Sequence, residues 1–375
     1  MNVEARFTQS IDKYVYGYLM LAVLLAAYVG WRMPSMWSIN YYLPSFFEGF
    51  YRRGLLGTLL YPLGDLRFSY SLMSSLQIAV LVTLIMFLLK YAYTAKIQQK
   101  MMLILFFLAP TGGYFFHLIG YSDQLLYLLL MVALVFIRFQ WVGLILMVAS
   151  LFIHEAALLT TIPIYFVSLL LNRVSSKRTI IDAVVIGGTF LCLTVFLQTV
   201  PVSKIEAFIT KVTQTIGDGA RLEYFSTFHN QYTSQAVDNT FYDLQNNVAP
   251  PPHGDFIFLY FEIVLLLIYA TLIATLFVDR QSHKSYQCLC YIAAWCACVM
   301  PLLLVFFGID AYRWVFLAYA SSVFMFCMAK KAPSNRCFLS MVCVYLIFLR
   351  YGYFWYFDGC APRGFEFPQL KLFWQ

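Results

Sequence analysis

Long apolar runs with few charges recur along this 375-residue chain and restrict what it can fold into. A helix rises 1.5 Å per residue, so about 20 apolar residues cross a bilayer hydrocarbon core that is about 30 Å thick. Runs of this length predict helices, which satisfy their own backbone hydrogen bonds in lipid. We therefore predict an all-α, polytopic transmembrane bundle of about 11 spans, at residues 14–33, 72–94, 101–118, 123–137, 140–154, 156–171, 179–200, 255–278, 286–308, 311–329 and 337–357.

The composition excludes several other classes of protein. The chain is 62% hydrophobic and only 11% charged, whereas soluble domains are about 25% charged. A soluble domain with one membrane anchor and a disordered chain are both excluded by these values. The net charge of +7 does not indicate nucleic-acid binding, because basic cytoplasmic loops produce the same excess in membrane proteins. We expect the lipid bilayer, and no nucleic acid, as a partner.

The fourth and fifth spans are short, and their separation depends on a break at Arg138 and Gln140. Without that break, the run from Leu125 to Ile153 would form one tilted helix, and every later loop would change sides. With the break and a cytoplasmic N-terminus, the cytoplasmic segments hold fourteen basic and four acidic residues, while the remaining chain holds eleven basic and fourteen acidic residues. This bias predicts a cytoplasmic N-terminus and an external C-terminus.

The predicted topology divides the chain into three parts. Residues 1–200 form an N-terminal bundle with a first outer loop at 34–71, residues 201–255 form a periplasmic loop domain, and residues 256–375 form a C-terminal bundle with an outer tail. The start MNVEARFTQSIDK shows no cleavable signal peptide. Together with the absence of clustered N-glycosylation motifs, this favours a bacterial inner membrane as the location.

Nearly all ionisable side chains that are able to do chemistry fall on the non-cytoplasmic side of this topology. An ionisable group at membrane depth is costly and usually faces a cavity or a partner. We therefore predict that the protein acts on something presented at that face. The residues concerned are Glu48, Arg52, Arg53, Asp65, His117, Asp123, His154, Glu155, Asp310 and Arg313.

The first outer loop is unusually rich in aromatic and leucine residues. Its spacing predicts short helices in the plane of the membrane interface, through Phe46, Phe47, Phe50, Leu55, Leu59 and Leu60. Arg52 and Arg53 beside Gly54 suit a phosphate or pyrophosphate, because guanidinium groups offer a planar fork and glycine allows close approach. They could instead serve as membrane anchors.

Several acids are candidates for a catalytic base. Glu48 lies one helical turn before Arg52, so it either acts as a base or forms a stabilising pair with that arginine. Asp65 is a weaker candidate. Asp123 begins a predicted span, where it and a capping Ser122 either do chemistry or stabilise the helix start.

His154 and Glu155 interrupt an apolar stretch that lacks the usual loop residues, which favours a functional role. A metalloprotease motif is excluded, because Leu158 stands where the second histidine would be. A divalent metal held by His117, Asp123, His154 and Glu155 is conceivable, but no spacing demands it, so we predict no cofactor. Asp310 and Arg313 either pair with each other or offer Arg313 as a second phosphate-facing cation.

The layout of the first 130 or so residues resembles that of the GT-C superfamily of membrane glycosyltransferases. A long outer loop with Glu48 and Asp65 follows the first span, and Asp123 follows at the next outer turn. In that family an acid of the first outer loop is the catalytic base, which implies this role for Glu48 or, less well, Asp65. The paired DD or ExD motif of many members is missing. The general make-up also resembles Wzy-type O-antigen or capsule polymerases, although their RxG-type motifs are not evident in residues 201–255.

These resemblances imply a glycosyltransferase or polymerase that acts at the periplasmic face on polyprenyl-(pyro)phosphate-linked sugars, in O-antigen, capsule or related surface polysaccharide synthesis. The expected partners are a lipid-linked sugar donor, a lipid-linked or polysaccharide acceptor, and a chain-length regulator or assembly proteins. The catalytic candidates are Glu48, Asp123, His154 and Glu155, with Arg52, Arg53 and Arg313 on the phosphate and Asp65, His117 and Asp310 as secondary candidates. The alternatives are a transporter or flippase of lipid-linked saccharide, with mid-span charges, and a membrane-bound acyltransferase.

Overall fold

The computed structural model describes residues 3–48, 53–196, 210, 256–278, 283–306 and 311–351. All regular structure in these ranges is helical, so the predicted all-α class is confirmed for them. Apart from Thr210, the predicted loop domain at 201–255 lies outside the described residues, as does the tail after Tyr351.

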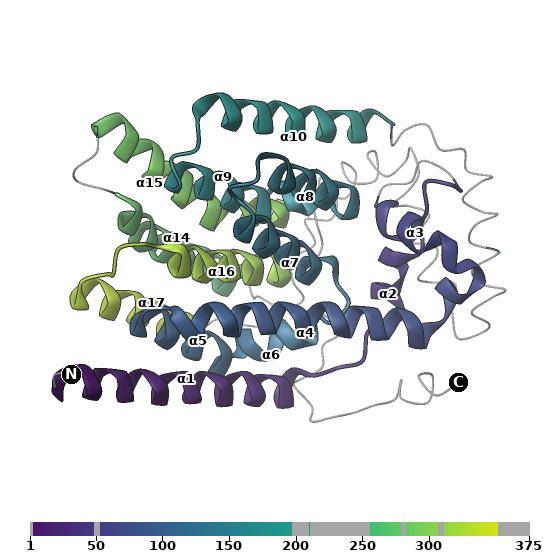
Figure 1. Ribbon diagram of the computed structural model, residues 1–375. Coiled ribbons are helices and arrows are strands. Elements are labelled where there is room, and N and C mark those ends of the chain that lie inside the picture. Colours follow the sequence, from purple (N-terminus) through teal and green to yellow (C-terminus); the bar gives the residue numbers. More distant parts are fainter. Residues whose placement is uncertain are drawn as a thin grey trace. The chain divides into compact units, whose positions relative to one another are not determined.

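The chain forms two units, and each is described by itself. Unit 1 comprises Met1–Arg32, Ile85–His117 and Ala249–Glu366. Its described helices (Figure 1) are α1 (Val3–Gly30), the end of α4 (Tyr70–Thr94), α5 (Ile97–Leu108), α6 (Pro110–His117), α14 (Phe256–Ala274), η5 (Thr275–Phe277), α15 (Lys284–Val299), η6 (Met300–Phe306), α16 (Ala311–Met328) and α17 (Asn335–Tyr351).

Unit 2 comprises Met33–Leu84, Leu118–Val248 and Phe367–Gln375. Its described helices are α2 (Met36–Ile39), η1 (Asn40–Tyr42), α3 (Leu55–Leu60), η2 (Tyr61–Phe68), the start of α4, α7 (Ser122–Val135), α8 (Gln140–Ile153), η3 (Glu155–Leu158), α9 (Thr161–Leu171) and α10 (Ser176–Phe196). The first outer loop therefore contains short helices, as its sequence predicts.

Three stretches of helix are long and apolar enough to cross a membrane alone: Ile11–Gly30, Tyr70–Thr94 and Lys284–Leu304. Helices α6 and α7 together make a fourth candidate, broken by the turn between them. Six further apolar helical stretches among the described residues run over 10 to 17 residues. The chain is thus a membrane protein with several transmembrane helices among its described residues. The predicted 11 spans are more than these criteria of length and apolar character identify.

Proline and charge set the breaks between helices. The predicted span 101–118 is divided into α5 and α6, because Pro110 has no N–H and holds Ala109 in an extended conformation (φ −83°, ψ 167°). The predicted break near Arg138 is present, since α7 ends at Val135 and α8 begins at Gln140. These two helices pack against each other, and the single tilted helix is therefore wrong.

Three tyrosine rings lie together in the core of unit 1. Tyr269 of α14, Tyr319 of α16 and Tyr345 of α17 are buried together, with ring centroids 5.9 to 6.1 Å apart. The Tyr345 hydroxyl shares a hydrogen bond of 2.7 Å with the hydroxyl of Thr111, which satisfies a polar group that would be costly to bury alone. These rings join the last helices of the chain to α6.

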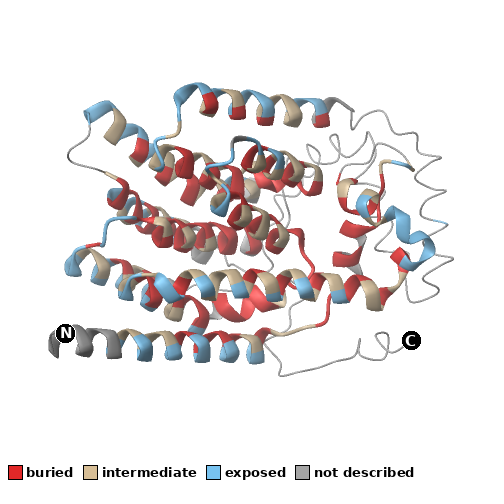
Figure 2. Cartoon of the chain, viewed as in Figure 1, coloured by how far each residue is buried: buried red, intermediate tan, exposed pale blue. Residues whose placement is uncertain are grey.

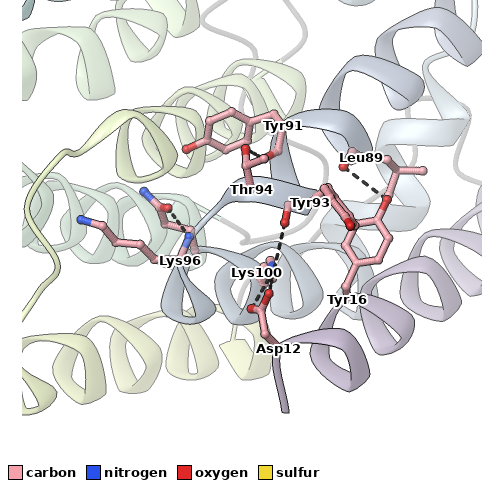
Figure 3. A network of polar contacts seen from close by, with 9 residues as sticks. Asp12, Tyr16, Leu89, Tyr91, Tyr93, Thr94, Lys96 and Lys100 are labelled. Carbon is pink, nitrogen blue, oxygen red and sulfur yellow. Dashed lines mark hydrogen bonds and ion pairs between the residues drawn. The ribbon is translucent and has the colours of Figure 1, made fainter. Parts of the chain in front are cut away.

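One buried cation holds α1 against α5 in unit 1. Lys100 is only 1% exposed and lies in the first turn of α5, where the partial positive charge of a helix N-terminus disfavours it. Both carboxylate oxygens of Asp12 lie 2.7 Å from the Lys100 ammonium, and the Tyr93 carbonyl accepts at 3.3 Å (Figure 3). The ring of Tyr16 completes the shell at 5.9 Å.

Turns that were predicted on one side of the membrane meet within each unit. In unit 1, the Lys96 ammonium donates to the Lys330 carbonyl, which joins the turn before α5 to the turn after α16. In unit 2, Arg178 donates to the Ile137 carbonyl at 3.0 Å, which joins the start of α10 to the α7–α8 turn. All four residues belong to predicted cytoplasmic turns or their edges, so these contacts agree with the predicted loop parity inside each unit.

The substitution Asp12→Asn leaves the Lys100 ammonium buried without its counter-charge. We expect the free energy of unfolding to fall by about 3 kcal/mol, measured calorimetrically on the protein in detergent. The double substitution Asp12→Asn with Lys100→Met removes both charges and is expected to recover most of the loss. Lys90→Gln, at an exposed position of α4, serves as a control. Wild-type stability of Asp12→Asn would show that this pair does not hold α1 in place.

Candidate functional site

Three segments that are distant in sequence meet around Tyr41 in unit 2. The Tyr41 ring centroid lies 5.2 Å from the guanidinium carbon of Arg53, 5.7 Å from the imidazole of His154 and 6.2 Å from the ring of Tyr121. The first outer loop, the turn before α7 and the turn after α8 therefore converge. Burial raises the pKa of the neighbouring Tyr42 phenol, so that side chain stays neutral. We call Tyr41, Arg53, Tyr121, His154 and Glu155 the Tyr41 cluster.

A two-pronged ion pair joins the first outer loop to the turn after α8. Arg53 donates from Nε to Glu155 Oε2 at 3.0 Å and from Nη2 to Oε1 at 2.5 Å. Bonds of this fork geometry are strong and fix orientation. Arg53 is 8% exposed and adopts φ +66°, a left-handed conformation that costs a non-glycine residue about 1–2 kcal/mol. The surrounding contacts therefore hold Arg53 in a strained backbone.

The tautomer of His154 follows from its backbone contact. His154 ends α8 and begins η3, and its Nδ1 accepts a hydrogen bond from the Ala156 N–H at 3.0 Å. Neutral imidazole with an accepting Nδ1 carries its proton on Nε2. Nδ1 lies 3.7 Å from Glu155 Oε2, and the two side chains form an ion pair only if the imidazole ring becomes protonated. In its neutral form His154 can donate a hydrogen bond through Nε2.

The turn before α7 is buried and tightly packed. Gly120 adopts φ +92°, and a Cβ there would lie 2.3 Å from Gln77 Oε1 and 2.5 Å from Ser38 Oγ, so glycine is required. Gln77 also donates to the Ser38 carbonyl at 3.1 Å. These contacts hold the turn against α4 and α2, and they place the buried Asp123 in the first turn of α7.

The predicted capping role of Ser122 is wrong. Tyr121 occupies the position before the helix in an extended conformation (φ −65°, ψ 145°), and Ser122 is already the first helical residue. The buried Ser122 hydroxyl makes no hydrogen bond within the described chain. The helix begins one residue earlier than a cap at Ser122 requires.

Glu48 has a partner that the sequence analysis missed. Its Oε1 binds Nη2 of Arg67, which is only 2% exposed and lies over the rings of Tyr61 (4.9 Å) and Phe68 (4.6 Å). The expected partner was Arg52, which lies outside the described residues. Arg67 stands among aromatic residues directly before a predicted span, and this position was the available signal. The sequence analysis considered only the adjacent arginines Arg52 and Arg53.

The other predicted site residues belong to both units or lie outside the described residues. Asp65 is exposed on η2. His117 and Arg313 belong to unit 1, where His117 stacks with Tyr114 at 6.2 Å and the buried Arg313 lies 4.8 Å from the Trp314 ring. Asp310 lies outside the described residues. Within the described ranges, no three His, Cys, Asp or Glu side chains gather closely enough to hold a metal ion.

No protein-family model matches this chain, and comparison with curated proteins and with solved structures finds no match either. The likeness to GT-C and Wzy-type proteins therefore rests on residue layout alone. Function has to be argued from the geometry of unit 2.

The Arg53–Glu155 pair can be tested by a double-mutant cycle. Arg53→Met and Glu155→Leu each leave a largely buried charge without its partner, so each is expected to lower the free energy of unfolding by about 3 kcal/mol. The double variant is expected to lose less than the sum, with a coupling of about 1–3 kcal/mol by calorimetry in detergent. Arg138→Met, at an exposed arginine of the same unit, is the control. Additive losses would contradict the pairing.

Proposed function

We propose that this chain is a glycosyltransferase of the bacterial inner membrane, which moves a sugar from a polyprenyl-(pyro)phosphate carrier to an acceptor hydroxyl at the periplasmic face. The observation that carries the proposal is the convergence of Arg53, His154 and Glu155 around Tyr41, beside the turn that contains Asp123. These groups stand at helix ends and not in the middle of helices. That position suits a substrate presented at a membrane face better than one carried across it.

The proposal includes the full topology of 11 spans, with the N-terminus in the cytoplasm. It also places α3 and η2 at the outer membrane interface. Much of this segment is exposed (Figure 2). Its exposed large apolar or aromatic residues are Leu59, Tyr61, Leu63 and Leu66, and Phe47 is exposed in the turn before it. The segment ends directly before α4, one of the stretches long enough to span. Aromatic and leucine residues beside a span favour the interface, where the lipid carrier of the substrate also lies.

Arg53 is proposed to stabilise the leaving phosphate. Glu155 engages the Nε and Nη2 edge of its guanidinium group and so fixes its orientation. Fixed donors aimed at developing charge usually contribute most to catalysis, since they need no rearrangement during the reaction. Glu155 is accordingly a positioning residue, and the hydrogen on Nε2 of His154 supplies a further donor for the same anion.

Asp123 is the proposed general base. Glu48 and Glu155 each pair with an arginine, and Asp123 lies in the first turn of α7, two residues after Tyr121 of the Tyr41 cluster. Asp123 takes the proton of the acceptor hydroxyl as that oxygen bonds to the anomeric carbon. The bond from this carbon to the phosphate oxygen breaks, and its electron pair leaves with the polyprenyl (pyro)phosphate.

The function is tested in the source bacterium by deleting the gene and restoring variants of it. Deletion is expected to abolish long-chain surface polysaccharide on gels, and wild type to restore it. Asp123→Asn is expected to lower transfer by about 10²–10⁴-fold and Arg53→Met to restore none, at normal protein abundance. Arg138→Met serves as the exposed control. Unchanged polysaccharide after deletion would contradict the function, and lipid-linked saccharide trapped at the inner leaflet would favour the flippase alternative.

The topology is tested by fusing alkaline phosphatase, which is active only outside the cytoplasm, at successive turns. Fusions after Ala95, Arg138 and Val174 are expected to be inactive, and fusions after Asp65, Gly120 and Leu159 active. The expectation follows from the loop parity and its basic bias. Equal activity on both sides of α7 or of α8 would contradict the crossing of these short helices.

A further inference from the structure

We propose that Glu48 and Arg67, beside the rings of Phe47 and Tyr61, form a subsite for a neutral sugar ring of the substrate. This inference rests on the proposed function for the identity of its ligand, and it assigns Glu48 a role in binding instead of proton transfer. It follows from the unmatched atoms of the pair, its charge, its aromatic surroundings and its place beside the Tyr41 cluster.

Half of the Glu48–Arg67 pair has no partner. Oε1 of Glu48 and Nη2 of Arg67 bind each other, but Oε2 of Glu48 and Nη1 of Arg67 are buried without a hydrogen bond to the described chain. A buried polar group left unmatched costs about 1–3 kcal/mol, and more when it is charged. The pair therefore offers one carboxylate acceptor and one guanidinium donor to a ligand. A sugar hydroxyl both donates and accepts, so neighbouring hydroxyls can satisfy both atoms.

The charge of the pair selects against an anion. Arg67 alone would attract phosphate, but the carboxylate of Glu48 neutralises it and repels a negative ligand at the same place. The Glu48 carboxylate does not repel a neutral ligand that carries several hydroxyl groups. The pair thus differs from Arg53 in the ligand that it fits, since Arg53 is proposed to face the phosphate.

The exposed Tyr61 ring lies against Arg67, and the exposed Phe47 ring lies against Tyr61. Phe47 is 69% exposed and Tyr61 is 41% exposed, and their ring centroids lie 4.9 Å apart. The guanidinium carbon of Arg67 lies 4.9 Å from the Tyr61 centroid, which places the polar pair and the ring platform together. A pyranose has an apolar C–H face and polar edges, so it can bury the face on such rings while its hydroxyls reach the pair.

The subsite adjoins the Tyr41 cluster within unit 2. The turn that carries Glu48 is tied to α3 because the Phe46 N–H donates to Thr58 Oγ1 at 2.8 Å, and Thr58 donates to the Gly54 carbonyl at 2.7 Å. Gly54 directly follows Arg53. The Phe46 ring also packs on Phe152 of α8 at 5.8 Å, two residues before His154. A sugar held at Glu48 and Arg67 therefore lies beside the groups proposed to act on its phosphate or acceptor oxygen.

The test is saturation-transfer NMR on the full-length protein in nanodiscs, with the methyl pyranosides of glucose, galactose, mannose, rhamnose and N-acetylglucosamine as probes. At least one probe is expected to receive saturation from the wild type. The double variant Glu48→Gln/Arg67→Met is expected to lose this signal while folding normally, because it leaves no single charge buried. Arg67→Lys, which keeps the charge but not the planar fork, is expected to weaken binding at least tenfold. Arg138→Met is the matched control and is expected to bind as wild type does.

The subsite is overturned if no probe receives more saturation from the wild type than from the double variant, as when the unmatched atoms bind only water. It is also overturned if Arg67→Lys and the double variant bind as tightly as wild type. Because binding requires no transfer, this readout is separate from the enzyme assay. Binding without sugar transfer would remove the proposed function and keep the subsite, whereas transfer with unaltered binding in the variants would remove only the subsite.

Discussion

The ion pair between Arg53 and Glu155 determines where the first outer loop lies in unit 2. The two residues are 102 positions apart, and both prongs of the fork are formed. A largely buried arginine without a carboxylate would be several kcal/mol less stable, so the loop can pack in this way only if the turn after α8 presents Glu155. The positions of Tyr41 and His154 follow from the same contact. The left-handed backbone of Arg53 is kept because the fork holds the side chain at its other end.

Pairing also separates the acids of this region by the chemistry open to them. Glu155 and Glu48 each pair with a buried arginine, so each carboxylate has a structural role as the partner of that arginine. Asp123 lies in the first turn of α7, close in sequence to Tyr121 of the Tyr41 cluster. The sequence analysis named several acids as candidates for the base, and the proposed function assigns this role to Asp123.

Local signals in the sequence were sufficient for much of the fold. Apolar length gives the helices, and the polar residues around Arg138 mark the break between α7 and α8. The break between α5 and α6 was missed, because the predicted span 101–118 ran through Pro110. The sequence predicted only that Arg53 and Glu155 lie on the same side of the membrane. Hydropathy carries no information about which side chains pair with each other. Glu48 was assigned to Arg52 by helical spacing, yet its described partner is Arg67, since the chain turns after Ser45 and is not helical there.

Uncharged residues account for the rest of what the sequence did not reveal. Tyr41 joins all three segments of its cluster, but in a chain with 28 tyrosines a single ring gives no signal. Gly120 became informative only when its neighbours Gln77 and Ser38 were known. Such contacts depend on packing between distant segments, which periodicity and spacing do not encode.

The two arginine pairs of unit 2 differ in a way that assigns them different tasks. Both carboxylate oxygens of Glu155 accept hydrogen bonds from Arg53, so this pair holds the guanidinium group in place. Glu48 accepts a hydrogen bond from Arg67 with one oxygen only, and each of the two side chains has a buried polar atom without a hydrogen bond to the described chain. A complete pair gains little from a ligand at its carboxylate, whereas an incomplete pair is stabilised by one. Neighbouring pairs of these two kinds are what a site needs if it must both orient a fixed charge and accept a neutral, hydroxyl-rich group beside it.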